Sequence, residues 1–384
     1  MNKLDKNSYP VKYQFTNVPI ELTMEDYTKA RKEFVDHISS DPGVVAIYQI
    51  GSVTAPGLSD LDFIVVLNDK RLTNVPSFFS ISNLGQKSQY VLMHEQFFVD
   101  RLIMKELPKL TAVFNMKKVY GEDVDICQLE GAGQRLLTQI LLNDIVVVAL
   151  GHEYATYLDS NVLDVRLTLA RMNSLKYPVN MFAALSGIRN ENWEACIDDF
   201  AQIRSQWFEL STQQRYEALG SCLHGAACLA DELVNQLDDF NRKNNFFEID
   251  KELRGFGTFR LGSNTLTFGN PADYKMDDIE TTTISGQILP VTFLLQLKEY
   301  TKENGPVSSF IRRNLRSRLA HTYSSPHRKL IMERINLVDT HISFLEKNRF
   351  MFGSMFNFGY QLSPCFYTHL VKRLRQKIVK LKKV

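Results

Sequence analysis

In the first hundred residues, the apolar positions change from a helical period to nearly continuous runs. A helix is predicted to begin after Thr23, because a hydroxyl side chain followed by acidic residues is typical of a helix N-terminus. Two apolar runs, at 44–50 and 61–67, then predict buried strands. A third strand is predicted at 90–95, with an extension to residue 99 as the longer alternative. The apolar face of the predicted helix consists of Met24, Tyr27, Phe34 and Ile38.

Beyond residue 130 the apolar positions recur with helical spacing, and a glycine-punctuated stretch interrupts them once. Within that stretch, short runs such as Thr265-Leu266-Thr267-Phe268 indicate a β-hairpin or a loop-rich connector. A long helix is predicted at 327–347. The predicted fold class is α/β, more narrowly α+β, with a small mixed sheet and flanking helices. The predicted regions are a sheet-containing domain at 1–130, a helical domain at 131–240, a β-containing insertion or connector at 241–290, and a C-terminal helical region at 291–384.

The composition is that of an average globular protein and argues against several classes. Hydrophobic residues make up 44% and charged residues 23% of the 384 positions, which disfavours disorder and collagen-like structure. The N-terminal residues lack the apolar core of a secretory signal, and polar side chains interrupt the longest apolar stretch, 136–150. The five cysteines are scattered and form no Cys-x-x-Cys pair, so free thiols are predicted. These features favour a cytoplasmic protein.

The net charge of +2 conceals an uneven distribution. Residues 366–384 carry seven basic side chains and no acidic one, which leaves −5 for the rest of the chain. The apolar positions of this tail have a helical period, so we predict a basic amphipathic helix. Packing on the acidic body is the favoured role for it. Peripheral contact with an anionic membrane surface, at the inner face of the membrane, comes second, and contact with nucleic acid phosphates comes third.

The residues best suited to chemistry lie between the first two predicted strands. The first strand ends in Gly51-Ser52, where a phosphate can approach the bare backbone and meet the N–H and hydroxyl of serine. Asp60 and Asp62 precede the second strand, and the two-residue period of a strand puts both carboxylates on one face. Two neighbouring carboxylates repel each other unless a cation neutralises them, and oxygen ligands favour Mg²⁺. Phosphate donors opposite an acidic pair are what nucleoside triphosphate chemistry requires.

At these residues the chain resembles the DNA polymerase β-like nucleotidyltransferase superfamily. The family pattern is a hydrophobic residue, Gly and then Gly or Ser, a loop, and Asp-hydrophobic-[Asp/Glu]-hydrophobic. Ile50-Gly51-Ser52 and Asp60-Leu61-Asp62-Phe63 match it, and the resemblance covers residues 20–125. It implies that the two acids hold two Mg²⁺ ions and that Gly51 and Ser52 bind the triphosphate of ATP or another NTP. The implied reaction transfers a nucleoside monophosphate to an acceptor hydroxyl and releases pyrophosphate.

Two alternative structures would also contain such an acidic pair. A solvated turn capped by Ser59 and Asp60 would place acids before a strand, but the upstream Gly-Ser and the strand on each side favour chemistry. Glycosyltransferases also use Asp-x-Asp, typically at the end of an apolar strand, whereas Asp60 and Asp62 precede one. The nucleotidyltransferase interpretation is therefore preferred.

The resemblance implies a third acid from a later strand, acting as a metal ligand or general base. Glu95 follows the apolar core of the third predicted strand, and Asp100 lies five residues later. Asp100 can instead cap a helix that begins near Arg101, so Glu95 is slightly favoured. His94 can assist the acceptor or orient Glu95, although a histidine at the end of a buried strand is more often structural.

A cation from the helical region is also implied by the resemblance. In related enzymes, a helix after the catalytic domain often supplies a cation to the triphosphate and an aromatic ring to the base. Lys176-Tyr177 would be this pair, although such residues more commonly belong to a solvated helix face.

The expected acceptor is a small molecule or a sugar-type metabolite, because the body is acidic and only the tail is basic. Transfer to a protein or to RNA stays open. The alternative from a different class is a non-catalytic scaffold or interaction protein that retains a nucleotide-binding domain.

Overall fold

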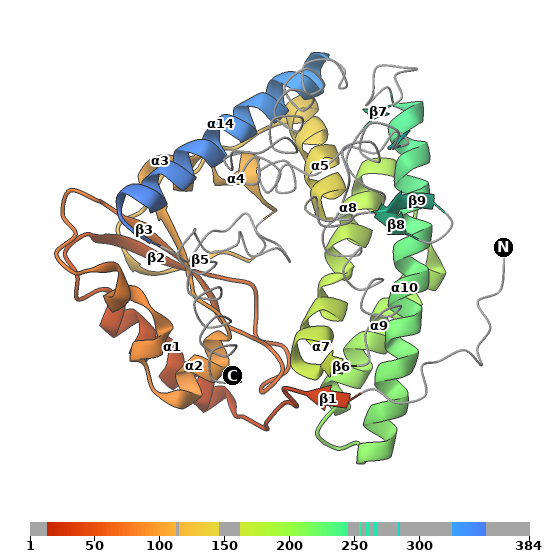
Figure 1. The fold of residues 1–384 in the computed structure, drawn as a ribbon, viewed down its shortest axis with the longest axis horizontal. Helices are drawn as coiled ribbons and strands as arrows, with labels where there is room; N and C mark the ends of the chain where they lie inside the picture. The colour runs from red at the N-terminus through yellow and green to blue at the C-terminus, as the bar shows by residue number, and fades with distance from the viewer. Residues whose placement is uncertain are drawn as a thin grey trace, which may run out of the picture. The chain divides into compact units, whose positions relative to one another are not determined.

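The structure, a computed structural model, describes residues 14–112, 115–145, 162–244 and 325–350, with four short strand segments between 253 and 284. It contains helices and small mixed sheets, so the predicted α+β class is confirmed (Figure 1). The chain divides into two compact units. A helical unit comprises Met1–Glu21 and Glu130–Met332, and a sheet unit comprises Leu22–Leu129 and Glu333–Val384.

The sheet unit is built on four strands in the order β4-β3-β2-β5. These strands are β2 (Val44–Ile50), β3 (Asp62–Leu67), β4 (Phe97–Asp100) and β5 (Lys117–Gly121). The central pair β2 and β3 is antiparallel, and β5 is antiparallel to β2. β4 runs parallel to β3, and the crossover between them contains α2 (Gln86–Leu92). The two strands predicted at 44–50 and 61–67 are thus neighbours in the sheet.

Helix α1 (Met24–Ile38) covers one face of this sheet. Its start is fixed as predicted: Thr23 and Asp26 form a reciprocal capping box, which satisfies two backbone N–H groups at the helix end. The ring of Phe34 stacks on Phe63 with centroids 4.7 Å apart, and both side chains are fully buried. Burial of a phenylalanine of this kind contributes about 1.5–3 kcal/mol. Met24, predicted on the buried face, is instead 49% exposed.

The third strand predicted at 90–95 is wrong. Residues 86–92 form α2, which buries Ser88, Val91 and Leu92, and the strand begins only at Phe97. The apolar run at 90–93 is compatible with either structure, because short apolar runs do not distinguish a strand from the end of a buried helix. The longer alternative, to residue 99, overlaps the observed strand by three residues.

Helix α14 (Ser325–Lys347) confirms the long helix predicted at 327–347 and begins two residues earlier. In the sheet unit, the Arg334 guanidinium donates to the carbonyl oxygens of Lys109 and Leu110 at 2.6 and 3.2 Å. Beyond the helix, the ring of Phe350 stacks on Phe98 with centroids 5.0 Å apart. These contacts tie a segment more than two hundred residues away in sequence to the sheet core.

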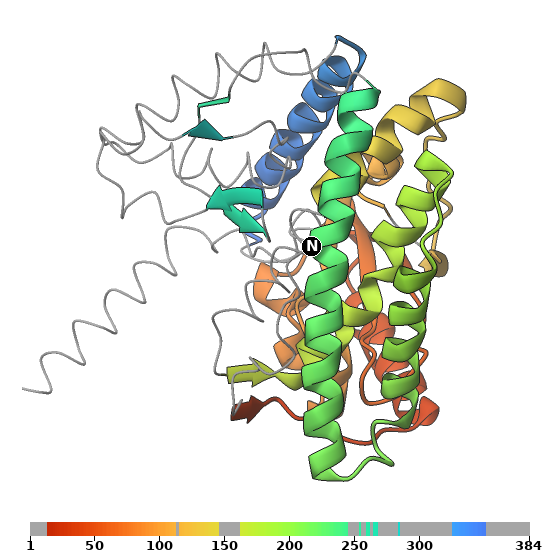
Figure 2. The same ribbon diagram turned by 90° about the vertical axis from the view of Figure 1, so that its right-hand side faces the viewer.

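The helical unit contains a two-stranded parallel sheet, formed by β1 (Gln14–Thr16) and β6 (Val162–Asp164), and five described α-helices (Figure 2). Trp193 and Trp207 are buried in this unit. The helices are α5 (Gly131–Ile145), α7 (Val165–Ser174), α8 (Lys176–Ser186), α9 (Glu191–Gln206) and α10 (Thr212–Lys243).

Short antiparallel strand pairs occur in the region predicted to be a β-containing insertion. They are β7 (Leu253–Arg254) with β10 (Thr283–Ile284), and β8 (Phe259–Leu261) with β9 (Asn264–Thr267). The basic tail at 366–384 lies outside the described residues, and so does residue range 291–324.

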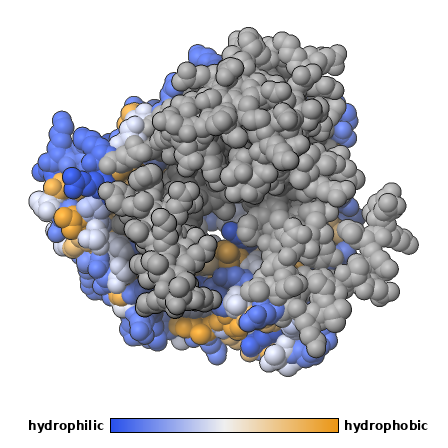
Figure 3. All heavy atoms as spheres, viewed as in Figure 1, coloured by the Kyte–Doolittle hydropathy of each residue, from blue (hydrophilic) through white to orange (hydrophobic). Residues whose placement is uncertain are grey.

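Hydrophilic residues cover much of the described surface seen in Figure 3, with hydrophobic residues scattered among them. The exposed large hydrophobic side chains include Val18, Ile20, Val75 and Leu102. No described helix combines the length and apolar character needed to cross a membrane.

Candidate metal centre

The two halves of the sequence motif meet where β2 ends and β3 begins. Ile50 and Asp62 are cross-strand partners, so the Gly51-Ser52 turn leaves the sheet beside the point where the acidic pair enters it. Gly51 has φ 71°, a left-handed conformation that favours glycine, and a Cβ atom added there would meet no atom of a described residue within 4 Å. Ser52 is exposed. Among the described residues, none fills the space next to the Cα atom of Gly51.

Buried hydrogen bonds hold the loop between the two half-motifs. The Tyr27 hydroxyl donates to the Ser59 carbonyl at 2.5 Å and accepts from the Gly57 N–H at 3.0 Å. The Tyr90 hydroxyl donates to the Gly57 carbonyl at 2.8 Å. The Ser59 hydroxyl oxygen accepts from the Ala55 N–H at 3.1 Å. Ser59 thus has a structural role, and the loop is anchored from α1 and α2 at a fixed distance from the sheet.

Asp60, Asp62 and His94 come together at this point. Each offers a ligand atom, and these atoms all lie within 4.8 Å of one another. The Nε2 atom of His94 is 3.0 Å from Oδ1 of Asp62. Among the described residues, this buried Oδ1 has no hydrogen-bond donor with acceptable geometry. The three side chains can hold a metal ion.

The hydrogen bond at the other ring nitrogen determines the state of His94. Its Nδ1 atom lies 2.8 Å from the carbonyl oxygen of Glu95, and a carbonyl only accepts, so Nδ1 carries a proton. In a neutral ring, Nε2 would then direct a lone pair at the carboxylate of Asp62. This contact is favourable only when a cation lies between them, either a proton or a metal ion. Metal-ligating histidines characteristically donate their second N–H to a carbonyl or carboxylate, as His94 does.

The pKa of His94 is raised, which shows that its surroundings favour a positive charge at this ring. Burial opposes protonation of the ring. The facing carboxylate of Asp62, the Glu95 carbonyl and the charge of Asp60 outweigh it and raise the pKa to about 9. A metal ion would replace this proton, because a histidine binds metal only in its neutral form.

The backbone just before His94 is strained. Met93 has φ 62° and ψ −41°, and the His94 N–H donates to the Leu92 carbonyl at 2.6 Å, which closes a γ-turn of the rare form. A non-glycine residue in such a conformation costs about 1–3 kcal/mol and persists where the surrounding structure enforces it. The turn ends α2 abruptly and brings His94 to the start of β3.

The two predicted third acids lie elsewhere. Glu95 accepts from the Ser80 hydroxyl at 2.6 Å and from the Ile81 N–H at 3.0 Å, so its carboxylate supports the 3₁₀ turn that begins at Ile81. Asp100 is the N-cap of α3 (Arg101–Lys105), and its Oδ1 accepts from the Ile103 N–H at 2.7 Å.

The strand register also separates Asp100 from the cluster. Asp100 pairs with Leu67, five residues along β3 from Asp62, which corresponds to about 16 Å at the rise of a strand. Among the described residues that offer a ligand atom, the third member of the cluster is thus a histidine. The sequence alone favours a structural role for His94. A sequence prediction that placed this strand at 97–100, paired in parallel with β3, would have put His94 beside the start of β3.

Lys176 belongs to the helical unit, where it begins α8. Its Nζ donates to Oδ1 of Asn173 at 3.3 Å and lies 5.2 Å from the centre of the Tyr177 ring. Burial, with a contribution from the charge of Arg204, lowers the pKa of this lysine.

The described cysteines are free, as predicted. Burial raises the pKa of both Cys196 and Cys222 to about 12, which makes these thiols unreactive at neutral pH.

Comparison with known proteins finds no family model that matches the chain, and no curated protein and no solved structure that matches it.

Proposed function

We propose that the protein is a metal-dependent nucleotidyltransferase that transfers a nucleoside monophosphate from an NTP to an acceptor hydroxyl. The observation that carries this proposal is the cluster of Asp60, Asp62 and His94 next to the Gly51-Ser52 turn. It is supported by the resemblance of these two half-motifs to the polymerase β-like nucleotidyltransferases. The antiparallel β2–β3 pair that joins the motifs is compatible with that interpretation.

The donor set fits a divalent ion. Carboxylate oxygens suit Mg²⁺ and Mn²⁺, and an imidazole nitrogen extends the choice to Zn²⁺ and other first-row metals. With His94 as a third donor, we expect Mn²⁺ to bind more tightly than Mg²⁺. When bound, the ion neutralises triphosphate charge and polarises the phosphoryl group.

Each residue has a distinct task in this proposal. Asp60, Asp62 and His94 hold the ion, and the N–H groups of Gly51 and Ser52 bind phosphate oxygens. The acceptor oxygen forms a bond to the α-phosphorus while the bond from that phosphorus to the bridging oxygen breaks, and pyrophosphate leaves. Because Glu95 and Asp100 are engaged elsewhere, the hydroxyl proton passes to solvent. The proposed acceptor is a small molecule or sugar-type metabolite.

One observation favours a second function, that of a non-catalytic nucleotide-binding protein. The resemblance implies three acids, whereas the cluster contains two acids and a histidine that carries a proton in the absence of metal. A centre of that kind can retain a nucleotide without transferring it.

Incubation with each α-³²P-labelled NTP, Mg²⁺ or Mn²⁺ and a small-molecule extract tests the proposal. We expect metal-dependent pyrophosphate release and a labelled product, both lost in Asp62→Asn. The matched control is Asp36→Asn, since Asp36 is an exposed aspartate on α1 that pairs with Lys32. Metal-dependent NTP binding without pyrophosphate release in any fraction would instead establish the non-catalytic alternative.

A further inference from the structure

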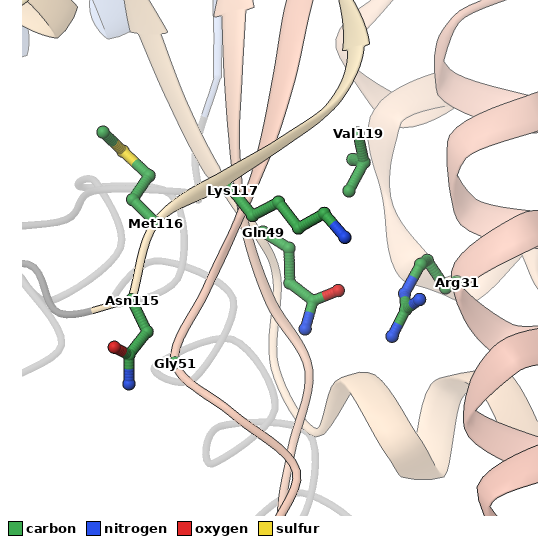
Figure 4. A pocket seen from close by; sticks show the side chains of 7 residues that line it. All are labelled: Arg31, Gln49, Gly51, Asn115, Met116, Lys117 and Val119. Carbon is green, nitrogen blue, oxygen red and sulfur yellow. The ribbon is translucent and has the colours of Figure 1, made fainter.

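Apart from the metal centre, the sheet unit contains a cavity with a volume of about 400 Å³. Its wall combines α1, the ends of β2 and β5, and the turn at Gly51 (Figure 4). The lining residues are Arg31, Gln49, Gly51, Asn115, Met116, Lys117 and Val119. Two of these side chains are cationic and none is acidic.

The cavity and the metal centre occupy opposite faces of the sheet. Gln49 is the cross-strand partner of both Phe63 and Lys117, so these three side chains share a face. Phe63 stacks on Phe34 of α1, which identifies this as the face that α1 covers. Asp62 precedes Phe63 on the same strand, and adjacent strand residues point to opposite faces. Gly51 lines the cavity and directly follows Ile50, the cross-strand partner of Asp62.

The polar groups of the cavity converge. The side chains of Arg31, Gln49 and Lys117 point toward one another in Figure 4. The Nε atom of Arg31 is buried and, within the described part of the chain, has no hydrogen-bond partner. Neither Arg31 nor Lys117 forms an ion pair with any described acid. Buried polar groups are nearly always paired, so an unpaired guanidinium N–H in a cationic cavity marks a place for an anion.

The charge and geometry of the cavity favour a phosphate group. A guanidinium and an ammonium together match the charge of about −2 of a phosphate monoester, whereas a carboxylate supplies −1. The planar fork of arginine binds two phosphate oxygens at once, lysine adds a point charge, and the Gln49 amide adds a donor. We propose that this cavity binds the phosphate group of a phosphorylated small molecule, separately from the metal centre.

Isothermal titration of the full chain with inorganic phosphate, in EDTA, tests this proposal. We expect one saturable site, with an affinity that falls about tenfold or more in Arg31→Gln and in Lys117→Gln, since each removes charged hydrogen bonds. The matched control is Lys118→Gln. Lys118 is the next residue on β5, pairs with Tyr48 on the opposite face and forms an ion pair with Asp123, so its loss should leave the affinity unchanged. Lys117 is exposed, which makes its replacement compatible with folding.

Three further titrations sharpen the result. Asp62→Asn should bind phosphate like the wild type, which separates this site from the proposed transfer reaction. Acetate should bind about tenfold more weakly than phosphate. Saturating Mg²⁺ and ATP should leave the phosphate affinity unchanged. Absence of saturable binding, wild-type affinity in both Arg31→Gln and Lys117→Gln, equal binding of acetate, or competition by Mg²⁺ and ATP would each overturn the proposal.

Discussion

The two faces of the β2–β3–β5 sheet differ in charge at the same end of the strands. One face carries Asp62 beside Asp60 and His94, and the other carries Gln49 and Lys117 opposite Arg31. The two-residue period of a strand produces this separation, because neighbouring residues of one strand point in opposite directions. Gly51, which lines the basic cavity, thus follows the residue that pairs with Asp62 of the acidic cluster.

The two faces also differ in which buried polar atoms lack a hydrogen bond. On the acidic face, the buried Oδ1 of Asp62 has His94 Nε2 at 3.0 Å but no hydrogen bond of acceptable geometry among the described residues. On the basic face, the buried Nε–H of Arg31 has no acceptor among them. A third carboxylate, Asp41 near the start of β2, shows the satisfied state. It accepts from the N–H groups of Gly43, Thr73 and Asn74. The protein itself therefore satisfies the carboxylate of Asp41, whereas we propose that ligands satisfy the groups at the other end of the strands.

Replacing an aspartate of the acidic cluster should have the largest effect, on the rate of pyrophosphate release. Asp62→Ala is expected to lower metal-dependent pyrophosphate release about a thousandfold or more, because the ion and the charge neutralisation that it supplies are lost together. Circular dichroism should show an unchanged fold. Turnover within tenfold of the wild type would show that the acidic pair is not the centre of the reaction.

Asp41 should behave in the opposite way, affecting stability and not metal binding. Asp41→Ala leaves the buried N–H of Gly43 and the part-buried N–H groups of Thr73 and Asn74 without their acceptor. It should lower the free energy of unfolding by about 2–4 kcal/mol, measured by urea titration. Asp36→Ala, which replaces an exposed aspartate, is the control. A change below 0.5 kcal/mol, roughly the range of surface substitutions, would contradict this role for Asp41.

The pKa of Asp41 determines how the stability contributed by this carboxylate depends on pH. Burial opposes ionisation, yet the hydrogen bonds from Gly43, Asn74 and Thr73 hold the pKa below its usual value. A depressed folded-state pKa adds stability above the unfolded-state pKa and loses it as the pH falls through the folded-state value. The stability gap between wild type and Asp41→Asn should therefore be widest near neutral pH and shrink in acid. A gap that widens in acid would reverse this assignment.

His94 is expected to contribute an intermediate amount. His94→Gln removes the imidazole ligand while both carboxylates remain, so the affinity for Mn²⁺ should fall about 10- to 100-fold. The affinity for Mg²⁺, which depends chiefly on the carboxylates, should change less. Equal losses for the two ions would indicate that His94 positions Asp62 and does not bind the metal.

The smallest expected effect concerns Met93. Met93→Gly should change the free energy of unfolding by no more than about 1 kcal/mol, since glycine relieves the strained φ of 62° but makes the chain more flexible when unfolded. Mn²⁺ affinity should decline slightly because His94 becomes less well fixed. A stability loss above 2 kcal/mol would show that the side chain of Met93, and not its backbone, is what matters at this turn.

Local signals in the sequence predicted much of the sheet unit. The capping box at Thr23 and the β-branched run at 44–50 gave the correct α1 and β2, because both depend on neighbouring residues. The run at 90–93 misled, since a buried helix end and a buried strand have the same short apolar signature. The meeting of Asp60 with Asp62 could be expected from strand alternation. The arrival of His94 beside them depends on a parallel pairing between distant segments, which no local pattern encodes.

The basic face illustrates the same limit. Arg31 lies on a helix and Lys117 on an edge strand, and their sequence neighbourhoods contain other cations that form ordinary surface ion pairs, such as Lys29 and Lys118. Sequence alone does not distinguish the two sets. The difference appears only when the β2–β5 register places Lys117 beside Gln49, under α1.

Metal binding by the acidic face is tested most directly by a Mn²⁺ titration of the full chain, followed by electron paramagnetic resonance. The wild type should remove at least one equivalent of Mn²⁺ from solution. The double variant Asp60→Asn/Asp62→Asn should remove none at the same concentrations, and Asp36→Asn should match the wild type. Equal Mn²⁺ uptake by the wild type and the double variant, or no uptake by either, would show that the acidic face is not a metal centre.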